Sequence, residues 1–204
     1  MSRVTTGVLA ATVAASFCCV NGDAIVVRAW AQGTPAAATR GTAPAVRPPA
    51  PGLVFAFELH ATVAAPTELG AVANGRRRIV EITGGTFEGP GIQGPGIKGK
   101  VRPGGADWQI VREDGFTELD TRYTIETDTG KLIYVQNAGM RHAPPDVMKK
   151  LLAGEAVDPA RVYFRTIPTF ETSAPELQWL TRAVFIGTGE RYPSEVVIRF
   201  WRVE

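Results

Sequence analysis

Residues 53–62 read LVFAFELHAT, and apolar side chains alternate with a mixed set along the whole stretch. Successive side chains of a β-strand point to opposite faces, so this period of two predicts a strand with one buried face. The predicted buried face consists of Leu53, Phe55, Phe57, Leu59 and Ala61. The stretch therefore opens a domain built from strands.

Eight further strand-like segments follow at short intervals, separated by turn signals such as Gly84-Gly85 and Thr129-Gly130. They span residues 78–83, 96–102, 106–112, 117–127, 131–138, 161–172, 177–187 and 194–203. One short helix is expected between Pro144 and Gly154. About nine strands with short connections predict an all-β fold, and we expect a single antiparallel β-barrel because closure removes exposed strand edges.

The N-terminal region has the composition of an export signal. Arg3 precedes a run of small and apolar residues at 8–20, and Ala29-Trp30-Ala31 matches the small-x-small pattern of a cleavage site. The run is shorter than the roughly 20 residues of a membrane span. We therefore predict a signal peptide over residues 1–31, a periplasmic or secreted location, and no stable membrane insertion after cleavage.

Residues 32–51 are rich in alanine and proline and have few bulky apolar side chains, which predicts a disordered tether. The folded domain is expected over residues 52–204. The two cysteines, Cys18 and Cys19, lie in the predicted signal. The mature chain would therefore have no thiol nucleophile and no thiolate metal site.

The charge balance argues against nucleic acid as a partner. Lysine and arginine number 22 and acidic residues 20, for a net charge of +2, and the one basic run is Arg76-Arg77-Arg78. On a strand, alternation would place the middle arginine on the face opposite its neighbours. The concentrated basic surface of a nucleic-acid binder is missing.

Common cofactor and metal motifs are also incomplete. Residues 94–99 spell G-x-G-x-x-G but lead into a predicted strand instead of the helix that a dinucleotide site needs. The chain has two histidines, His60 and His142, and no G-x-S-x-G nucleophile motif. A carboxylate site for a divalent ion lacks recognisable spacing. We expect neither a cofactor nor a metal.

Taken together, ten segments of the domain resemble the family catalogued as domain of unknown function 3237, also called uncharacterised protein family 0311. The matching segments are residues 75–77, 79–85 (IVEITGG), 87–90 (FEGP), 96–101, 103–108 (PGGADW), 119–123 (LDTRY), 128–134, 163–165 (YFR), 168–172 (PTFET) and 179–180. The resemblance covers roughly residues 53–203 in the expected order. It implies a calycin-like antiparallel barrel and implies little about chemistry.

In the segment PGGADW, a predicted tight turn is followed at the start of a strand by an acid, Asp107, and a large aromatic residue, Trp108. In one interpretation Asp107 caps the turn and Trp108 fills the core. In the other, Asp107 lies at the rim of a pocket as a general acid or base, and Trp108 stacks on an apolar ligand ring.

The predicted strand at 118–126 has a polar face that includes Asp120 and Arg122. Facing solvent, the two would form a surface pair worth under about 1 kcal/mol. Facing the lumen, they would form a charged binding floor. The pattern alone does not choose between the two arrangements. We favour the surface one, and Asp120 stays a catalytic candidate beside Asp107 because the lumen arrangement remains open.

The ligand-binding candidates are cationic, aromatic or acidic side chains that the strands would carry near turns. Arg165 shares a strand face with Tyr163 and suits a carboxylate or phenolate ligand, or a structural pair with an acid. The full set is Arg76, Trp108, Arg122, Tyr123, Tyr134, Arg165, Glu171 and Trp179. Tyr134 and Trp179 could equally pack in the core.

Three hypotheses for function remain. The first is a barrel that binds a small, partly aromatic organic molecule and runs isomerase, lyase or hydrolase chemistry through Asp107 or Asp120, with Arg165 or Arg76 steadying negative charge. The second is a non-catalytic ligand carrier. The third is a structural or homo-oligomerising barrel whose interior is filled.

Overall fold

The computed structural model describes residues 49–92 and 94–204. Across these residues the chain forms ten strands, one α-helix and two 3-10 helices. The strands are β1 (Leu53–Val63), β2 (Thr67–Val72), β3 (Gly75–Gly89), β4 (Ile97–Val101), β5 (Gly105–Val111), β6 (Thr117–Thr127), β7 (Leu132–His142), β8 (Tyr163–Glu171), β9 (Phe185–Arg191) and β10 (Glu195–Val203). The helices are α1 (Pro145–Leu152), η1 (Pro159–Arg161) and η2 (Pro175–Leu180).

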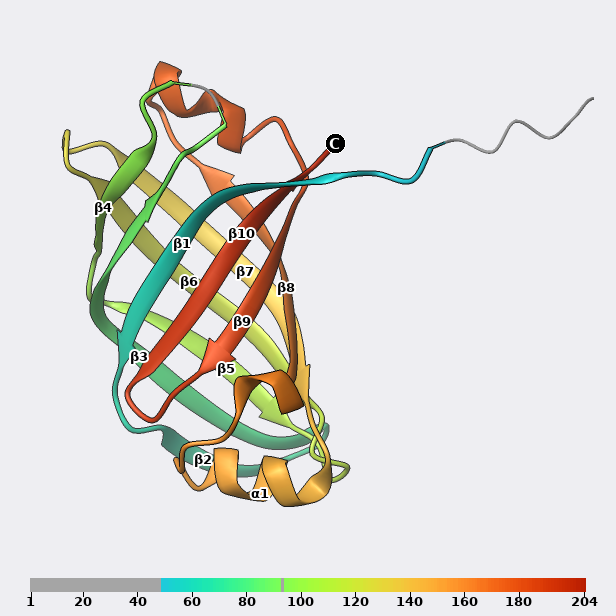
Figure 1. The fold of residues 1–204 in the computed structure, drawn as a ribbon. Helices are drawn as coiled ribbons and strands as arrows, with labels where there is room; N and C mark the ends of the chain where they lie inside the picture. Colours follow the sequence, from blue (N-terminus) through green and yellow to red (C-terminus); the bar gives the residue numbers. More distant parts are fainter. Residues whose placement is uncertain (1–48, 93) are drawn as a thin grey trace, which may run out of the picture. The chain divides into compact units, whose positions relative to one another are not determined.

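The strands close into an antiparallel barrel (Figure 1). Going round, β1 pairs with β10, then come β9, β8, β7 and β6. β4 and β5 both pair with β6 on one side and β3 on the other, so they share one position, and β3 pairs with β1 to complete eight positions. β4 and β5 run in one direction and are separated at Pro103, which has no N–H to donate to a ladder. The predicted barrel is confirmed.

The structure corrects several predicted element boundaries. The strand expected at 78–83 is the much longer β3, and β2 was not predicted. Residues 159–161 form η1 and residues 175–180 form η2, so the strands expected from 161 and from 177 begin later, at Tyr163 and Phe185. Proline at the first helical position of both η1 and η2 favours a helical start over a strand. The predicted helix is confirmed as α1.

Strict alternation does not hold along β1. The register with β10 shifts between Phe55 and Phe57, which marks a bulge. Leu53 is exposed, and Phe55 packs edge-on against Trp201 with the ring centroids 5.3 Å apart. The prediction that both belong to the buried face is therefore wrong, because one extra residue in the strand reverses the side to which the earlier residues point.

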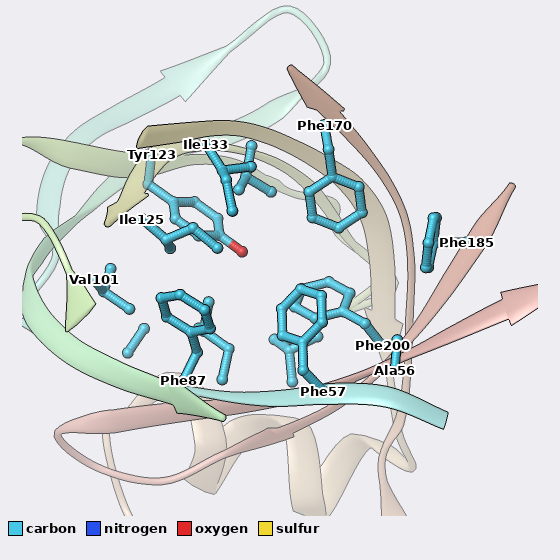
Figure 2. Packing of buried hydrophobic residues seen from close by; sticks show 14 of the residues in the cluster. Ala56, Phe57, Phe87, Val101, Tyr123, Ile125, Ile133, Phe170, Phe185 and Phe200 are labelled. Atoms are coloured by element: carbon cyan, nitrogen blue, oxygen red, sulfur yellow. The ribbon is translucent and has the colours of Figure 1, made fainter. Parts of the chain in front are cut away.

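One half of the barrel interior is filled with phenylalanine rings (Figure 2). Phe57 lies 4.7 Å from Phe200 and 5.9 Å from Phe87 between ring centroids, and Phe170 lies 5.2 Å from Phe185. Such aromatic pairs add to the free energy gained by burying their surface. Apart from Tyr123, the residues labelled there are apolar, so most of the described polar groups of the lumen lie in the other half.

A short helix covers each end of the barrel (Figure 1). η2 lies at the phenylalanine-filled end, where Leu177 and Leu180 join the core. α1 lies at the opposite end and buries Val147, Met148 and Leu151. Of the helices in the described ranges, none is long and apolar enough to cross a membrane.

Candidate functional site in the barrel interior

The inward-facing residues change from apolar to polar along the strands that lead towards α1. On β7, Ile133 and Val135 point inward and are followed on the same face by Asn137 and Arg141. β5 contributes Asp107 and Gln109, and β8 contributes Thr166. These side chains surround a cavity of about 40 Å³. Its apolar lining includes Leu59, Ala61, Val63, Val80, Ile82, Phe164, Val196 and Ile198.

Asp107 is the acid of this cavity. Gln109 donates a hydrogen bond from Nε2 to Oδ2 of Asp107 at 2.5 Å. The other carboxyl oxygen, Oδ1, is closed off from solvent and has no hydrogen-bond partner among the described residues. Burial raises the pKa of Asp107 above its ordinary value, and the Gln109 hydrogen bond and the charge of Arg141 counteract this only in part.

Arg141 is the most deeply buried base, with 2% of its surface exposed. Burial lowers its pKa from 12.5 to about 10, the charge of Asp107 opposes that change, and the like charges of Arg191 and Arg78 add to it. The guanidinium carbon lies 5.7 Å from the ring centroid of Phe164, a cation–π distance. Arg141 therefore stays protonated at neutral pH in an environment that disfavours its charge.

Several polar atoms around the cavity lack hydrogen-bond partners in the described part of the chain. They are Oδ1 of Asp107, Oε1 of Gln109, the hydroxyl of Tyr123, Oδ1 of Asn137, Nε of Arg141 and Oγ1 of Thr166. Buried polar side chains in folded proteins are nearly always paired, so a group of unpaired ones needs a reason. Their convergence on one cavity is the arrangement expected of a site that binds a polar ligand.

Of the ten residues predicted from the sequence, this cavity brings together two, Asp107 and Tyr123. Asp120 and Arg122 form an ion pair at 3.2 Å on the outer face, where their side chains are 44% and 48% exposed. The polar face of β6 thus faces solvent, which is the arrangement that we favoured from the sequence. Arg76 is also exposed and pairs with Glu68 at 3.2 Å.

Trp108 and Arg165 likewise lie outside the barrel. Trp108 follows an inward residue on β5 and points outward, so it neither fills the core nor shares a pocket with Asp107. The guanidinium of Arg165 lies 5.0 Å from the ring centroid of Tyr163 on the outer face of β8. Tyr134 pairs in register with exposed Glu171 on the same outer surface. The barrel wall separates all of them from Asp107.

Trp179 lies at the η2 end, on a groove of about 900 Å³ that is open to solvent. Its wall includes Phe55, Glu176 and the segment 94–98. No side chain that lines this groove, among those described, buries an unpaired polar atom. The groove is larger than the inner cavity, but most of the buried polar atoms without partners belong to residues of the inner cavity, which is therefore the better candidate.

The residues that the sequence reasoning missed are the inward-facing polar ones, namely Arg78, Gln109, Asn137, Arg141, Thr166 and Arg191. A signal for two of them was present. Asn137 and Arg141 lie an even number of residues after Ile133 and Val135, so they belong to the same face of the strand. That buried face is therefore apolar at first and polar further along. Such a switch on a buried face indicates a lumen that is polar at one end.

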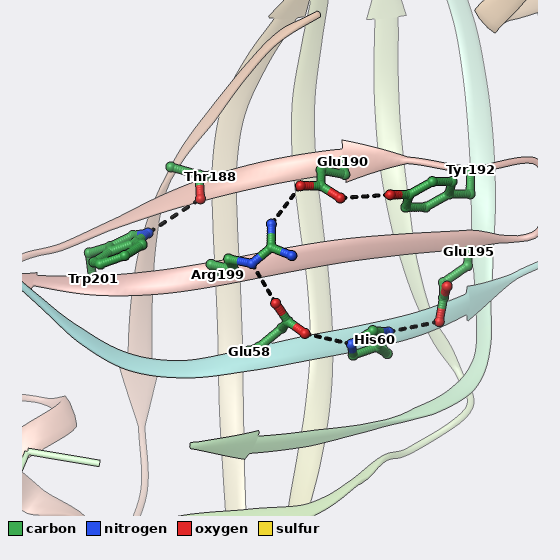
Figure 3. Close-up of polar contacts among 8 residues, drawn as sticks. All are labelled: Glu58, His60, Thr188, Glu190, Tyr192, Glu195, Arg199 and Trp201. Atoms are coloured by element: carbon green, nitrogen blue, oxygen red, sulfur yellow. Dashed lines mark hydrogen bonds and ion pairs between the residues drawn. The ribbon is translucent and has the colours of Figure 1, made fainter. Parts of the chain in front are cut away.

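A second polar cluster lies on the outer surface, across β1, β9 and β10 (Figure 3). His60 contacts Glu58 at 2.8 Å and Glu195 at 3.0 Å, and Arg199 bridges Glu58 and Glu190. Burial alone would lower the pKa of His60, but the hydrogen bonds to the two glutamates raise it. These groups satisfy one another, as expected of a surface histidine. In the described ranges, no three His, Cys, Asp or Glu side chains gather as metal ligands.

Fold and cavity together define a class: a closed antiparallel barrel with one half packed and the other half polar. The chain belongs to the family described as "Protein of unknown function (DUF3237)", whose model matches residues 51–203. A UPF0311 protein of Rhodopseudomonas palustris (strain TIE-1) is 44% identical over 144 residues, which is 71% of this chain and 91% of that protein. A UPF0311 protein of Clostridium acetobutylicum is 42% identical over 129 residues, 63% of this chain and 78% of that protein. The resemblance noted in the sequence is confirmed.

Solved structures support the same assignment. A conserved protein of unknown function from Rhodopseudomonas palustris superposes with a TM-score of 0.71 at 39% identity, covering 77% of this chain and 100% of that one. A β-barrel-like protein from Acinetobacter baumannii gives a TM-score of 0.65 at 38% identity, covering 78% and 99%. An enzyme from Penicillium herquei, with a TM-score of 0.55 and 22% identity over 78% and 98%, shares the fold.

Proposed function

We propose that the polar half of the barrel binds a small organic molecule and that Asp107 exchanges a proton with it. The observation that carries the proposal is the Asp107 carboxyl group, which is enclosed in the lumen with one oxygen unpaired and facing a cavity. A carboxyl group whose pKa is raised can both hold and accept a proton closer to neutral pH than an ordinary aspartate. The Penicillium herquei protein supports the idea only in that an enzyme can be built on this fold.

The chemistry that fits best is proton transfer at a carbon next to a carbonyl group. The Asp107 carboxylate would accept the proton, and the C–H electron pair would move towards the carbonyl oxygen to form an enolate. Arg141 carries the positive charge that stabilises such an oxyanion in a water-poor site. Return of the proton to another carbon gives an isomerase, and loss of a leaving group gives a lyase.

Replacing Asp107 with asparagine tests the proposal. A small-molecule extract is incubated with the protein in D₂O, and mass spectrometry measures how fast deuterium replaces hydrogen in the substrate. In Asp107→Asn the rate of this exchange should fall by at least about 100-fold. Asp128→Asn is the matched control, because Asp128 is 56% exposed and pairs with Lys98 at 3.4 Å. Undiminished exchange in Asp107→Asn, or its loss in Asp120→Asn instead, would contradict the proposal.

The pH dependence of stability separates a proton-transfer role from a structural one. Because the folded-state pKa of Asp107 is raised, protonated Asp107 contributes stability that is complete below the unfolded pKa of about 3.9 and is lost as the pH rises through the folded pKa. Asp107→Asn should therefore match the wild type in acid and be equally or more heat-stable at neutral pH. A marked drop in melting temperature at neutral pH would make Asp107 architectural.

Binding without turnover is the second candidate function, and the small size of the cavity favours it. In that case a ligand copurifies unchanged and no deuterium enters it. The third idea, a structural barrel, rests on the phenylalanine-filled half. A purely structural barrel does not explain why the other half contains polar groups without hydrogen-bond partners.

Export to the periplasm or medium is part of the proposal. The predicted signal peptide (1–31) and nearly all of the predicted tether (32–51) lie outside the described residues, and the proposal rests on their sequence pattern. Mass spectrometry of the protein recovered outside the cytoplasm should find an N-terminus at Gln32. Recovery of the full-length chain from the cytoplasm alone would contradict export.

A further inference from the structure

The lumen near α1 contains more positive than negative charge. Arg78, Arg141 and Arg191 are close enough to influence one another's ionisation, and Asp107 is the acid that acts on all three. Burial pushes that acid towards its neutral form. Apart from Asp107, the described residues that line the cavity include no carboxylate, so three guanidinium groups face a single acid in the lumen.

In the described part of the chain, none of the three guanidinium groups donates a hydrogen bond to a carboxylate. Nε of Arg78 stands 3.7 Å from Glu68, which is beyond hydrogen-bond distance. Arg191 donates from Nη1 to the backbone carbonyl of Glu195 at 3.2 Å, a neutral acceptor. Nε of Arg141 has no acceptor at all. Buried positive charge that exceeds the negative charge around it is costly, so an arrangement of this kind is adapted to receive an anion.

The size of the cavity limits which part of a ligand can enter. A water-sized group needs about 10–15 Å³ of such space, so about 40 Å³ accepts roughly three heavy atoms. A carboxylate has three heavy atoms, and its two oxygens match the planar fork of a guanidinium. The amides of Gln109 and Asn137 and the hydroxyl of Thr166 could orient it. The apolar remainder of the lining suits the hydrogen or methyl group that the smallest acids carry next to the charged head.

We propose that this cavity binds short-chain organic acids by their carboxylate, with Arg141 as the principal anion-binding residue and Arg78 and Arg191 as supporting positive charges. The inference rests on the proposed function only for the location of the ligand in the barrel interior. It adds the charge and size of the ligand, which the acid–base proposal leaves open.

Matched acids and amides test the inference directly. Titration calorimetry and thermal shift on the intact protein should detect formate and acetate, whereas formamide and acetamide at the same concentration should bind at least about 30-fold more weakly, since hydrogen bonds to charged groups are worth roughly twice neutral ones. Sodium chloride at equal ionic strength controls for non-specific screening. Equal binding of acid and amide would overturn the inference.

Variants then locate the binding. Arg141→Met should weaken formate and acetate binding by at least about 100-fold, because it removes the buried positive charge that pairs with the carboxylate. Arg161→Met is the control, since Arg161 is 52% exposed and pairs with Asp146 on the surface. Arg78→Met provides a second test and should weaken binding less. Wild-type affinity in a folded Arg141→Met protein would overturn the inference.

The outcomes distinguish the two proposals. Asp107→Asn should keep or improve formate and acetate binding, because it removes a carboxyl group that can carry negative charge from the lumen, while deuterium exchange is lost. If carboxylates fail to bind but Asp107-dependent exchange persists, the inference fails and the proposed function stands. If carboxylates bind and exchange does not depend on Asp107, the proposed function fails and the inference stands.

Discussion

Replacing Gly85 with alanine is expected to unfold the barrel or to lower its unfolding free energy by at least about 4 kcal/mol. Gly85 lies on β3 opposite Ala61 of β1, the strand pair that closes the barrel. An added Cβ would overlap the carbonyl oxygen of His60 and come within 3.0 Å of the Cα of Ala61. The backbone φ of +133° adds strain for any residue with a side chain.

Urea denaturation followed by circular dichroism measures this effect. Gly104→Ala is the matched control, because Gly104 has a φ of +100° but no atom within 4 Å of the added Cβ. It should cost only the backbone strain, about 1–2 kcal/mol. Similar losses in both variants would mean that close strand approach at Gly85 is not what closes the barrel.

Arg141→Met should have the opposite effect and raise the melting temperature. Burial lowers the pKa of Arg141 from 12.5 to about 10, so the folded state holds this proton less firmly than the unfolded state does. The charged group therefore costs stability at every pH below about 10, and that cost is relieved as the pH rises towards the unfolded value. Methionine removes the charge and keeps most of the stem volume.

The expected gain in stability of Arg141→Met follows from the change in the pKa of Arg141 on folding. At about 1.4 kcal/mol per pKa unit, the upper limit is roughly 3 kcal/mol, or a rise of several degrees for a domain of this size. Differential scanning calorimetry at pH 7 measures it, and Arg161→Met should change the melting temperature little, because its ion pair is exposed. A lower melting temperature for Arg141→Met would show that the guanidinium supports the barrel wall.

The two halves of the barrel contribute differently to its stability. The phenylalanine half supplies apolar burial, and residues such as Gly85 let the strands approach closely enough to close around it. The other half holds charged and unpaired groups that cost stability. Functional sites commonly carry such a cost, and the well-packed half offsets it here.

Much of the fold could be predicted from residue order. Alternating apolar residues, glycine turns and the Pro145–Leu152 helix specify local structure that short segments adopt largely by themselves. Family membership also follows from linear motifs. The bulge at Phe55 could not be predicted, because it depends on the register between β1 and β10, whose residues are far apart in the chain.

The sequence by itself determined an all-β chain with acids and arginines on its strands, and it singled out both Asp107 and Asp120 as candidates. Only the tertiary structure decided where each of them lies, with Asp107 in the lumen and Asp120 in solvent. Alternation assigns residues to two faces but does not say which face is inside. That is settled when eight strand positions close and one face of every strand must share a single interior.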